Sequence, residues 1–309
     1  MSKASLAADP REVDDRYRSI FFTEWDTRLA ETLEIAVESD FPSGKDHDKV
    51  GELITGLAVA PLKVEGSDYD HYAPQPGKNV TVTSDIYKFA FKATEELRDF
   101  GQSSQTDEYA RLMAQIMDHT IKVQIYNMLN RGFNSSYPTL YEAKEMCATN
   151  HTLATGGTAT NELATPADPS ETSLESLIEL LVSTPNEDGV FMPIAPRRYV
   201  TAISNWGTAM RLTGSSQTTL QGTGESGNAI MAVTRAWNIL PHFSPYLTDA
   251  DASFVIGDRS PIRLTWARRP DLRPVYIDPG TDDWIWRIKA QWKVYAPTWR
   301  GIVGTAGAA

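Results

Sequence analysis

The feature that most constrains this chain is the stretch 106–132, which has no proline and no glycine before its last position. Its apolar residues recur at steps of three and four, which predicts one long helix. At about 1.5 Å per residue this helix would be roughly 40 Å long, which suits a spine that carries separate lobes. The face predicted to be buried consists of Tyr109, Leu112, Met113, Ile116, Met117, Thr120 and Val123.

The opposite side of this predicted helix is a narrow polar strip that includes Asp118 and Lys122. The strip becomes apolar from Ile125 onward, so we expect the helix to be covered on more than one side. A simple long core helix is the alternative interpretation. The flanking segments favour a spine.

Two extended segments, 52–64 and 80–92, flank a very polar stretch at 65–79. Together they predict a long β-ribbon with a polar tip. A projecting hairpin is marginal when alone in water, so we expect the ribbon to lie on another subunit. A hairpin folded back on its own domain is the alternative. The tip residues that we regard as candidates for contact are Asp68, Tyr69, Asp70, His71, Tyr72 and Lys78.

The rest of the chain alternates helical and extended patterns. Residues 1–16 are predicted to be a polar arm. Three helices are expected, at 17–38, at Ser170–Ser183 and from Pro196 to about Leu212, and Pro42 lies just after the first of them. The expected strands cover 191–194, 253–257, 262–268, 274–277 and 284–295. In the last strand apolar residues from Trp284 to Val294 alternate with Arg287, Lys289, Gln291 and Lys293. This period of two predicts one buried and one open face.

Composition restricts the function classes. The single cysteine, Cys147, excludes an internal disulfide and a cysteine-rich metal site, and the five histidines are isolated in sequence. No run of about 18 apolar residues predicts a membrane span. The net charge of −11 argues against a protein that binds nucleic acid through the electrostatic field of the whole molecule. The charge is uneven, however, because residues 259–300 hold nine Lys/Arg and four Asp, a local charge of +5.

Few patterns suggest chemistry. Gly222, Gly224 and Gly227 match G-x-G-x-x-G, but no buried strand precedes them, so an exposed flexible loop is predicted rather than a dinucleotide site. Asp68, Asp70 and His71 could bind a cation, and a polar loop tip explains them equally well. No constellation supports acid–base or nucleophilic catalysis, so we expect neither a cofactor nor an enzyme. A nucleotide-dependent enzyme stays an alternative that nucleotide binding would favour.

The order of elements resembles the major capsid proteins of tailed double-stranded DNA bacteriophages, which share the HK97-like fold. The local matches are NMLNRGF at 127–133, ATNHTLATGGTATN at 148–161 and the closing stretch from Trp286 to Gly301, which ends in W-R-G. The resemblance implies an α+β fold with five parts. These are an N-terminal arm and helix at 1–51, an extended E-loop ribbon at 52–92, a peripheral domain with the spine helix at 93–169, an axial domain at 170–257 and a return to the peripheral domain at 258–309.

This resemblance also implies a function. The chain would self-assemble into hexamers and pentamers of an icosahedral shell that encloses double-stranded DNA with weak contact. A portal, a possible decoration protein and a separate scaffolding protein (or a segment cleaved before residue 1) would be its partners, with assembly in the host cytoplasm and residence in the virion. The loop containing Gly222, Gly224 and Gly227 would lie near the capsomer axis, and Arg287, Lys289 and Lys293 would face neighbouring subunits. An encapsulin-like nanocompartment shell protein is the alternative within this fold.

Overall fold

The computed structural model describes residues 10–53, 62, 65, 76–94, 103–154, 156–214 and 229–308. The chain divides into two compact units. The first comprises Met1–Asp48, Val82–Gln124 and Leu264–Val294, and the second comprises Lys49–Thr81, Ile125–Arg263 and Tyr295–Ala309.

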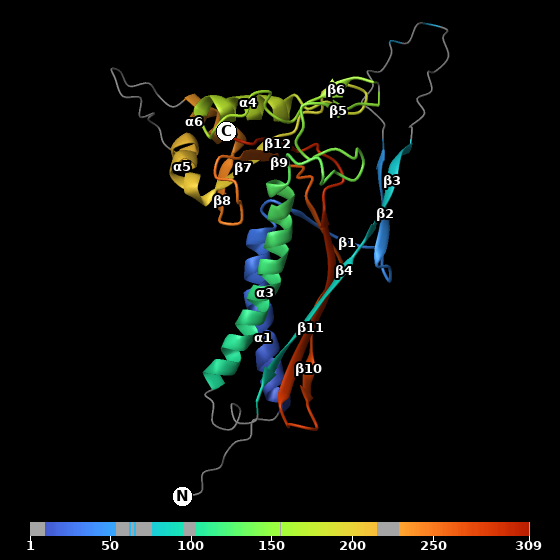
Figure 1. Cartoon of the computed structure of the whole chain (residues 1–309), viewed down its shortest axis with the longest axis vertical. Helices are drawn as coiled ribbons and strands as arrows, with labels where there is room; N and C mark the ends of the chain where they lie inside the picture. The colour runs from blue at the N-terminus through green and yellow to red at the C-terminus, as the bar shows by residue number, and fades with distance from the viewer. Residues whose placement is uncertain are drawn as a thin grey trace, which may run out of the picture. The chain divides into compact units, whose positions relative to one another are not determined.

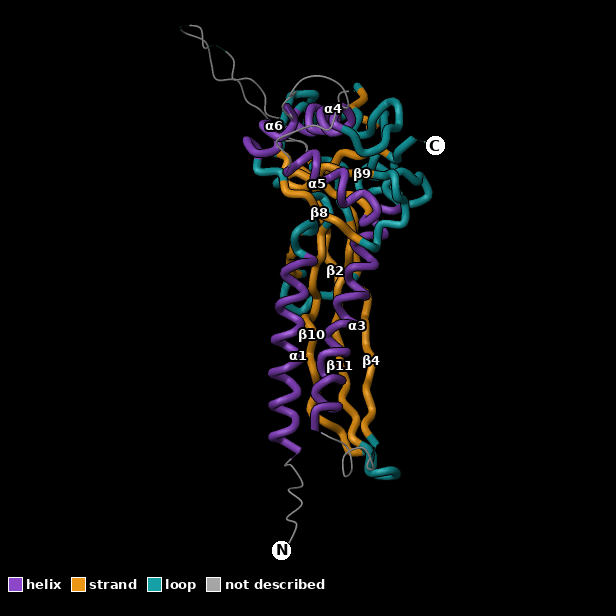
Figure 2. Tube along the Cα trace, turned by 90° about the vertical axis from the view of Figure 1, so that its left-hand side faces the viewer, coloured by secondary structure: helices purple, strands orange, loops and turns teal. Residues whose placement is uncertain are grey.

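The first unit combines two long helices with a four-stranded sheet (Figures 1 and 2). The helices are α1 (Pro10–Thr32) and α3 (Ser103–Asn130), the latter up to Gln124. The strands are β1 (Val37–Asp40), β10 (Arg263–Ile277), β11 (Trp284–Tyr295) and β4 (Asp85–Ala93), in the order β1-β10-β11-β4. β11 is antiparallel to β4, with Ile288 opposite Phe89.

Aromatic side chains join the helices to one face of this sheet. Tyr17 of α1 stacks on Trp286 with ring centroids 4.6 Å apart. The indole Nε1 of Trp292 donates to Gln124 Oε1 of α3 at 2.9 Å. The apolar residues of β11 are therefore buried on the helix side, as the alternation predicted, and its charged residues lie on the open face.

The second unit is built on a sheet in the order β12-β9-β7-β8. Its strands are β12 (Ile302–Thr305), β9 (Ser253–Gly257), β7 (Pro196–Ala202) and β8 (Leu240–Ser244). The helices α4 (Glu171–Val182), α5 (Trp206–Gly214) and α6 (Ala229–Trp237), with the 3-10 turn η1 (Ile203–Asn205), accompany it. Leu174, Leu177 and Leu181 of α4 pack with Tyr199, Val255 and Val303 of the sheet in one core.

Two short strand pairs complete the described elements. β2 (His47–Leu53) pairs with β3 (Pro76–Thr83). Most of the second arm of the predicted ribbon, 80–92, is instead strand β4, which pairs with β11 in the four-stranded sheet. β5 (His151–Thr152) pairs with β6 (Thr158–Ala159). Of the predicted tip residues, Lys78 lies in β3, whereas Asp68, Tyr69, Asp70, His71 and Tyr72 lie outside the described residues.

The spine helix exists as predicted, but the predicted face was partly wrong. Leu112 and Ile116 are 40% and 50% exposed, whereas Asp118 is buried. Asp118 Oδ1 accepts a hydrogen bond from Thr32 Oγ1 of α1 at 2.9 Å, and its Oδ2 lies 2.9 Å from Lys122 Nζ. Asp118 can lie on the buried face because Thr32 of α1 and Lys122 of α3 itself contact its carboxylate. It consists of Ala110, Met113, Ala114, Met117, Asp118, Ile121, Ile125, Tyr126 and Leu129.

Other boundaries also differ from the prediction. The segment after Pro196 begins as strand β7, because Tyr199, Val200 and Thr201 favour a buried strand and proline is tolerated at a strand's first residue. The helix follows only at Trp206. The first helix ends at Thr32 rather than near residue 38, and 191–194 forms no strand beyond one isolated bridge at Phe191, which is 68% exposed. The predicted strands 262–268 and 274–277 are one strand, β10.

Candidate assembly sites

A basic pocket lies on the open face of the sheet in the first unit. Its charged lining is Lys88 of β4, Arg273 of β10, and Arg287 and Lys289 of β11. The cavity measures about 320 Å³, and Phe89, Ala90 and Ile288 complete its lining. We call these four cations and the cavity between them the basic pocket. Two of the four, Arg287 and Lys289, were predicted from sequence; Lys88 and Arg273 were not.

The charges of the basic pocket are not compensated within the described part of the chain. Lys88 and Lys289 are directly opposed in the β4–β11 register, and like charges at such a position destabilise a sheet. No carboxylate lines the pocket. Arg287 lies over the ring of Tyr276, with Cζ 5.1 Å from its centroid, which is a cation–π contact and leaves the charge unneutralised. Such a site suits an anionic group of another molecule.

Neighbouring cations on the same sheet differ, because they already have partners in their own chain. Lys293 Nζ lies 2.9 Å from Asp85 Oδ2, and Lys92 Nζ lies 2.5 Å from Asp283 Oδ2. Lys293 is therefore less available to a neighbouring subunit than its alternation with tryptophans indicated.

The glycines of the predicted flexible loop, Gly222, Gly224 and Gly227, lie outside the described residues.

A second polar site is buried in the other unit, around His151. The imidazole Nδ1 lies 2.7 Å from Glu142 Oε2, and Nε2 lies 2.9 Å from Asn161 Oδ1. The amide of Asn161 has a defined orientation, because its Nδ2 donates to the carbonyls of Met146 and Ile302 at 2.8 and 3.0 Å. We call Glu142, His151 and Asn161 the histidine hub.

The hydrogen bonds of the hub hold both ring nitrogens of His151. Asn161 Oδ1 also accepts from the backbone N–H of Ala148 at 2.8 Å, so it faces His151 as an acceptor. Glu142 faces the other ring nitrogen with a carboxylate oxygen. Both ring nitrogens of His151 therefore lie within hydrogen-bond distance of an oxygen atom, one from an amide and one from a carboxyl group.

The W-R-G ending of the chain covers this hub. The ring of Trp299 stacks on His151 with centroids 4.3 Å apart and an interplanar angle of 7°. Arg300 Nη1 lies 2.8 Å from Glu187 Oε1, and Gly301 has φ of +103°, where a Cβ would lie 1.9 Å from the carbonyl oxygen of Arg259. Glycine is therefore required at position 301.

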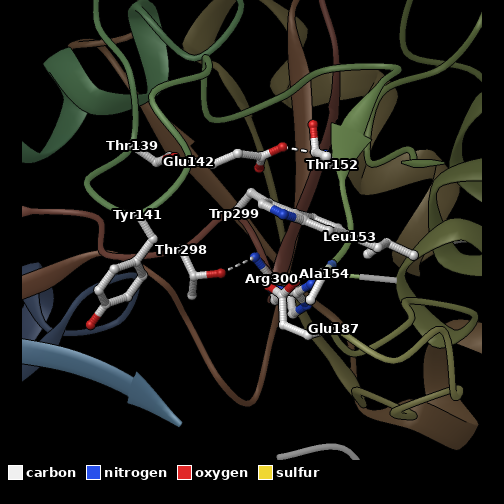
Figure 3. A pocket seen from close by; sticks show the side chains of 10 residues that line it. All are labelled: Thr139, Tyr141, Glu142, Thr152, Leu153, Ala154, Glu187, Thr298, Trp299 and Arg300. Atoms are coloured by element: carbon white, nitrogen blue, oxygen red, sulfur yellow. Dashed lines mark hydrogen bonds and ion pairs between the residues drawn. The ribbon is translucent and has the colours of Figure 1, made fainter. Parts of the chain in front are cut away.

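Beside the hub is a cavity of about 270 Å³ (Figure 3). The side chains of Glu142, Trp299 and Arg300 lie around it, together with Tyr141 and Thr152.

The single cysteine of the chain, Cys147, is buried. Burial raises the pKa of its thiol well above the ordinary value, so the thiol stays neutral. The described residues hold no group of three His, Cys, Asp or Glu side chains suited to a metal ion.

Sequence reasoning missed this hub. His151 was regarded as one of five isolated histidines, because its partner Glu142 follows no periodic pattern. The only signal was the resemblance of 148–161 to a family stretch, and that stretch contains both His151 and Asn161.

The stretch 127–133 also has a physical role. Asn130 Nδ2 donates to the carbonyl of Tyr246 at 2.9 Å, and Asn130 Oδ1 accepts from Thr248 N–H at 3.0 Å.

The hub predicts a pH dependence of stability. Burial alone would raise the pKa of Glu142, but hydrogen bonds from His151 and from Thr152 N–H, with the positive charges of His151 and Lys144, leave this pKa below its ordinary value of 4.5. A lowered folded-state pKa contributes stability above the unfolded pKa, and this is lost as the pH falls through the folded value. Wild type should therefore be more stable than Glu142→Gln at neutral pH.

The measurement is the unfolding midpoint of wild type and of Glu142→Gln from about pH 7 to about pH 3. The difference in stability between the two proteins should become smaller below pH 4.5. Burial, and to a smaller extent the charge of Glu145, raises the pKa of Glu162. This raised pKa changes stability with pH in the opposite direction, but its effect is the same in both proteins. Parallel pH profiles for the two proteins would contradict the lowered pKa of Glu142.

Comparisons with known proteins agree with this architecture. The profile of a family described as phage capsid protein matches residues 78–305. No curated protein matches the chain in sequence. The structure resembles the virus-like particle from Pyrococcus furiosus, at 11% identity and a TM-score of 0.52, over 94% of this chain and 98% of the other.

Two further solved structures show the same likeness. A phage-related protein from Bordetella bronchiseptica RB50 has 10% identity and a TM-score of 0.55, over 93% of this chain and 95% of the other. The capsid of cyanophage P-SCSP1u has 9% identity and a TM-score of 0.55, over 90% and 88%.

The fold and these likenesses define an HK97-like, shell-forming structural protein, as the element order predicted. The chain belongs to the phage capsid protein family. None of its described helices combines the length and apolar character that crossing a bilayer requires.

Proposed function

We propose that this chain is the major head protein of a tailed double-stranded DNA phage and tiles into the hexamers and pentamers of an icosahedral shell. The family match over residues 78–305 carries the proposal. The proposed partners are other copies of the chain, a separate scaffolding protein, a portal and possible decoration proteins. Assembly would take place in the host cytoplasm, and the shell would enclose DNA with weak contact because each subunit has a net charge of −11.

The domain roles are part of the same proposal. Residues 52–92 would form the E-loop ribbon and 170–257 the axial domain, with the loop that contains Gly222 near the capsomer axis. Closed shells require heterologous contacts that repeat around an axis, and the residues proposed for them lie at the ribbon tip, at this loop and in the basic pocket.

The direct test is negative-stain microscopy of the expressed chain with sedimentation analysis of the same sample. We expect closed shells hundreds of ångströms across, which only repeated self-association can produce. An encapsulin-like nanocompartment would also give shells, and would be favoured if particles load protein cargo rather than DNA. A monodisperse monomer that binds nucleotide would favour the enzyme alternative.

The ribbon gives a more specific prediction. Deleting residues 66–75 removes the polar tip but keeps β3, which begins at Pro76. We expect a soluble, folded subunit that forms no stable shells, because a projecting ribbon contributes to the shell rather than to the core of its own subunit. Circular dichroism checks the fold and sedimentation checks assembly. Shells of normal size and yield from the deletion would refute the ribbon's role.

A further inference from the structure

We propose that the basic pocket binds the acidic face of helix α4 of a second copy of this chain. The proposal rests on the proposed self-assembly, and it names two surfaces that would meet. One is the group of four cations on the open sheet of the first unit. The other is a row of glutamates on α4 of the second unit.

The acidic face of α4 consists of Glu171, Glu175 and Glu179, which follow one another at four-residue steps. Their side of the helix lies next to the side formed by the buried residues Leu174, Leu177, Ile178 and Leu181, and Glu175 and Glu179 are exposed. The helix contains no Lys or Arg. Like charges at i and i+4 destabilise a helix, so this row carries repulsion that a cationic partner would relieve.

Within the described part of the chain, neither surface is neutralised by an ion pair. Among the described residues, none of the three glutamates and none of the four pocket cations takes part in an ion pair. Other exposed carboxylates differ: Asp85 pairs with Lys293, and Glu38 pairs with Arg269 at 2.6 Å. The basic pocket and the acidic face are thus two charged surfaces of opposite sign with no ion-pair partner among the residues that the structure describes.

The spacing of the two surfaces is also compatible. Residues four apart on a helix are about 6 Å apart along its axis. Residues two apart on a strand, such as Arg287 and Lys289, are about 6.7 Å apart. Glu175 and Glu179 can therefore face these two cations at once, while Lys88, opposite Lys289, and Arg273 complete the cationic side.

The acidic face favours another copy of this chain as the occupant, because it supplies carboxylates opposite in charge to the pocket. Copies that each carry −11 repel one another at long range, so their association needs local surfaces of opposite charge. Every copy carries both the basic pocket and the acidic face, so the contact would be heterologous and could repeat from subunit to subunit.

The test is charge reversal with rescue in the full-length chain. Arg287→Glu with Lys289→Glu, and separately Glu175→Lys with Glu179→Lys, should each lower the fraction of subunits in shells about tenfold or more. The four changes together should restore it to within about threefold of wild type, because the pairing is re-formed with its signs exchanged. Circular dichroism and the unfolding midpoint of unassembled subunits report folding, and sedimentation reports assembly.

The matched control is Lys45→Glu with Arg235→Glu, which changes the net charge by the same amount at two exposed cations outside the basic pocket and should leave assembly near wild type. If a reversal prevents folding, the neutral pairs Arg287→Gln/Lys289→Gln and Glu175→Gln/Glu179→Gln replace it. Each should weaken assembly and reduce its sensitivity to salt.

Three outcomes would overturn the inference while wild type still forms shells. The first is normal assembly of both reversed variants, and the second is a fourfold variant that does not recover assembly. The third is recovery of assembly when the pocket reversal is combined with Asp68→Lys and Asp70→Lys, which would make the ribbon tip the partner of the pocket. Tight duplex DNA binding by wild type, lost on pocket reversal, would assign it to phosphate. If wild type itself forms no shells, the proposed function fails first.

Discussion

Replacing Ile121 with aspartate is expected to leave this chain insoluble or unfolded. Ile121 lies on the buried face of α3 and has no exposed surface. Burying an unpaired carboxylate there costs several kcal/mol, a large share of the roughly 5–15 kcal/mol that stabilises a typical domain. The measurement is the soluble fraction after expression, followed by circular dichroism of any soluble protein.

The matched control is Ile116→Asp on the same helix. Ile116 is 50% exposed, so a carboxylate there keeps its contact with water, and the variant should fold with a loss within about 1 kcal/mol. The pair distinguishes the observed buried face from the one that periodicity alone predicted. Equal damage from both substitutions would mean that the helix is covered on the Ile116 side as well.

Replacing Asn161 with leucine should destabilise the second unit by several kcal/mol. Asn161 is fully buried, and leucine would leave the N–H of Ala148, Nε2–H of His151 and two backbone carbonyls without a partner. Each unsatisfied buried group costs about 1–3 kcal/mol. Denaturant unfolding of unassembled subunits measures the change.

The control is Asn150→Leu in the same stretch of sequence. Asn150 is exposed and its Oδ1 accepts from Lys144 Nζ at 3.2 Å on the surface, so the change should be small. A similar loss for both variants, or a small loss for Asn161→Leu, would contradict the central role of the hub.

Local patterns were sufficient for the elements whose sequence and environment agree. The spine helix, the final strand with its three tryptophans and helix α4 all appear where periodicity placed them. In α4 the boundary was readable as well, because Ser170 and Ser173 form a capping box at its first turn. The order of these elements was enough to indicate the capsid family.

Tertiary structure decided what depends on neighbours distant in sequence. Asp118 is buried because Thr32, 86 residues away, donates to it, and no period in 106–132 reveals that partner. Pro196 begins a strand because β9 and β8 lie on either side of the segment. The histidine hub and the basic pocket each combine residues from several segments, so the chemistry of both sites exists only once the chain has folded.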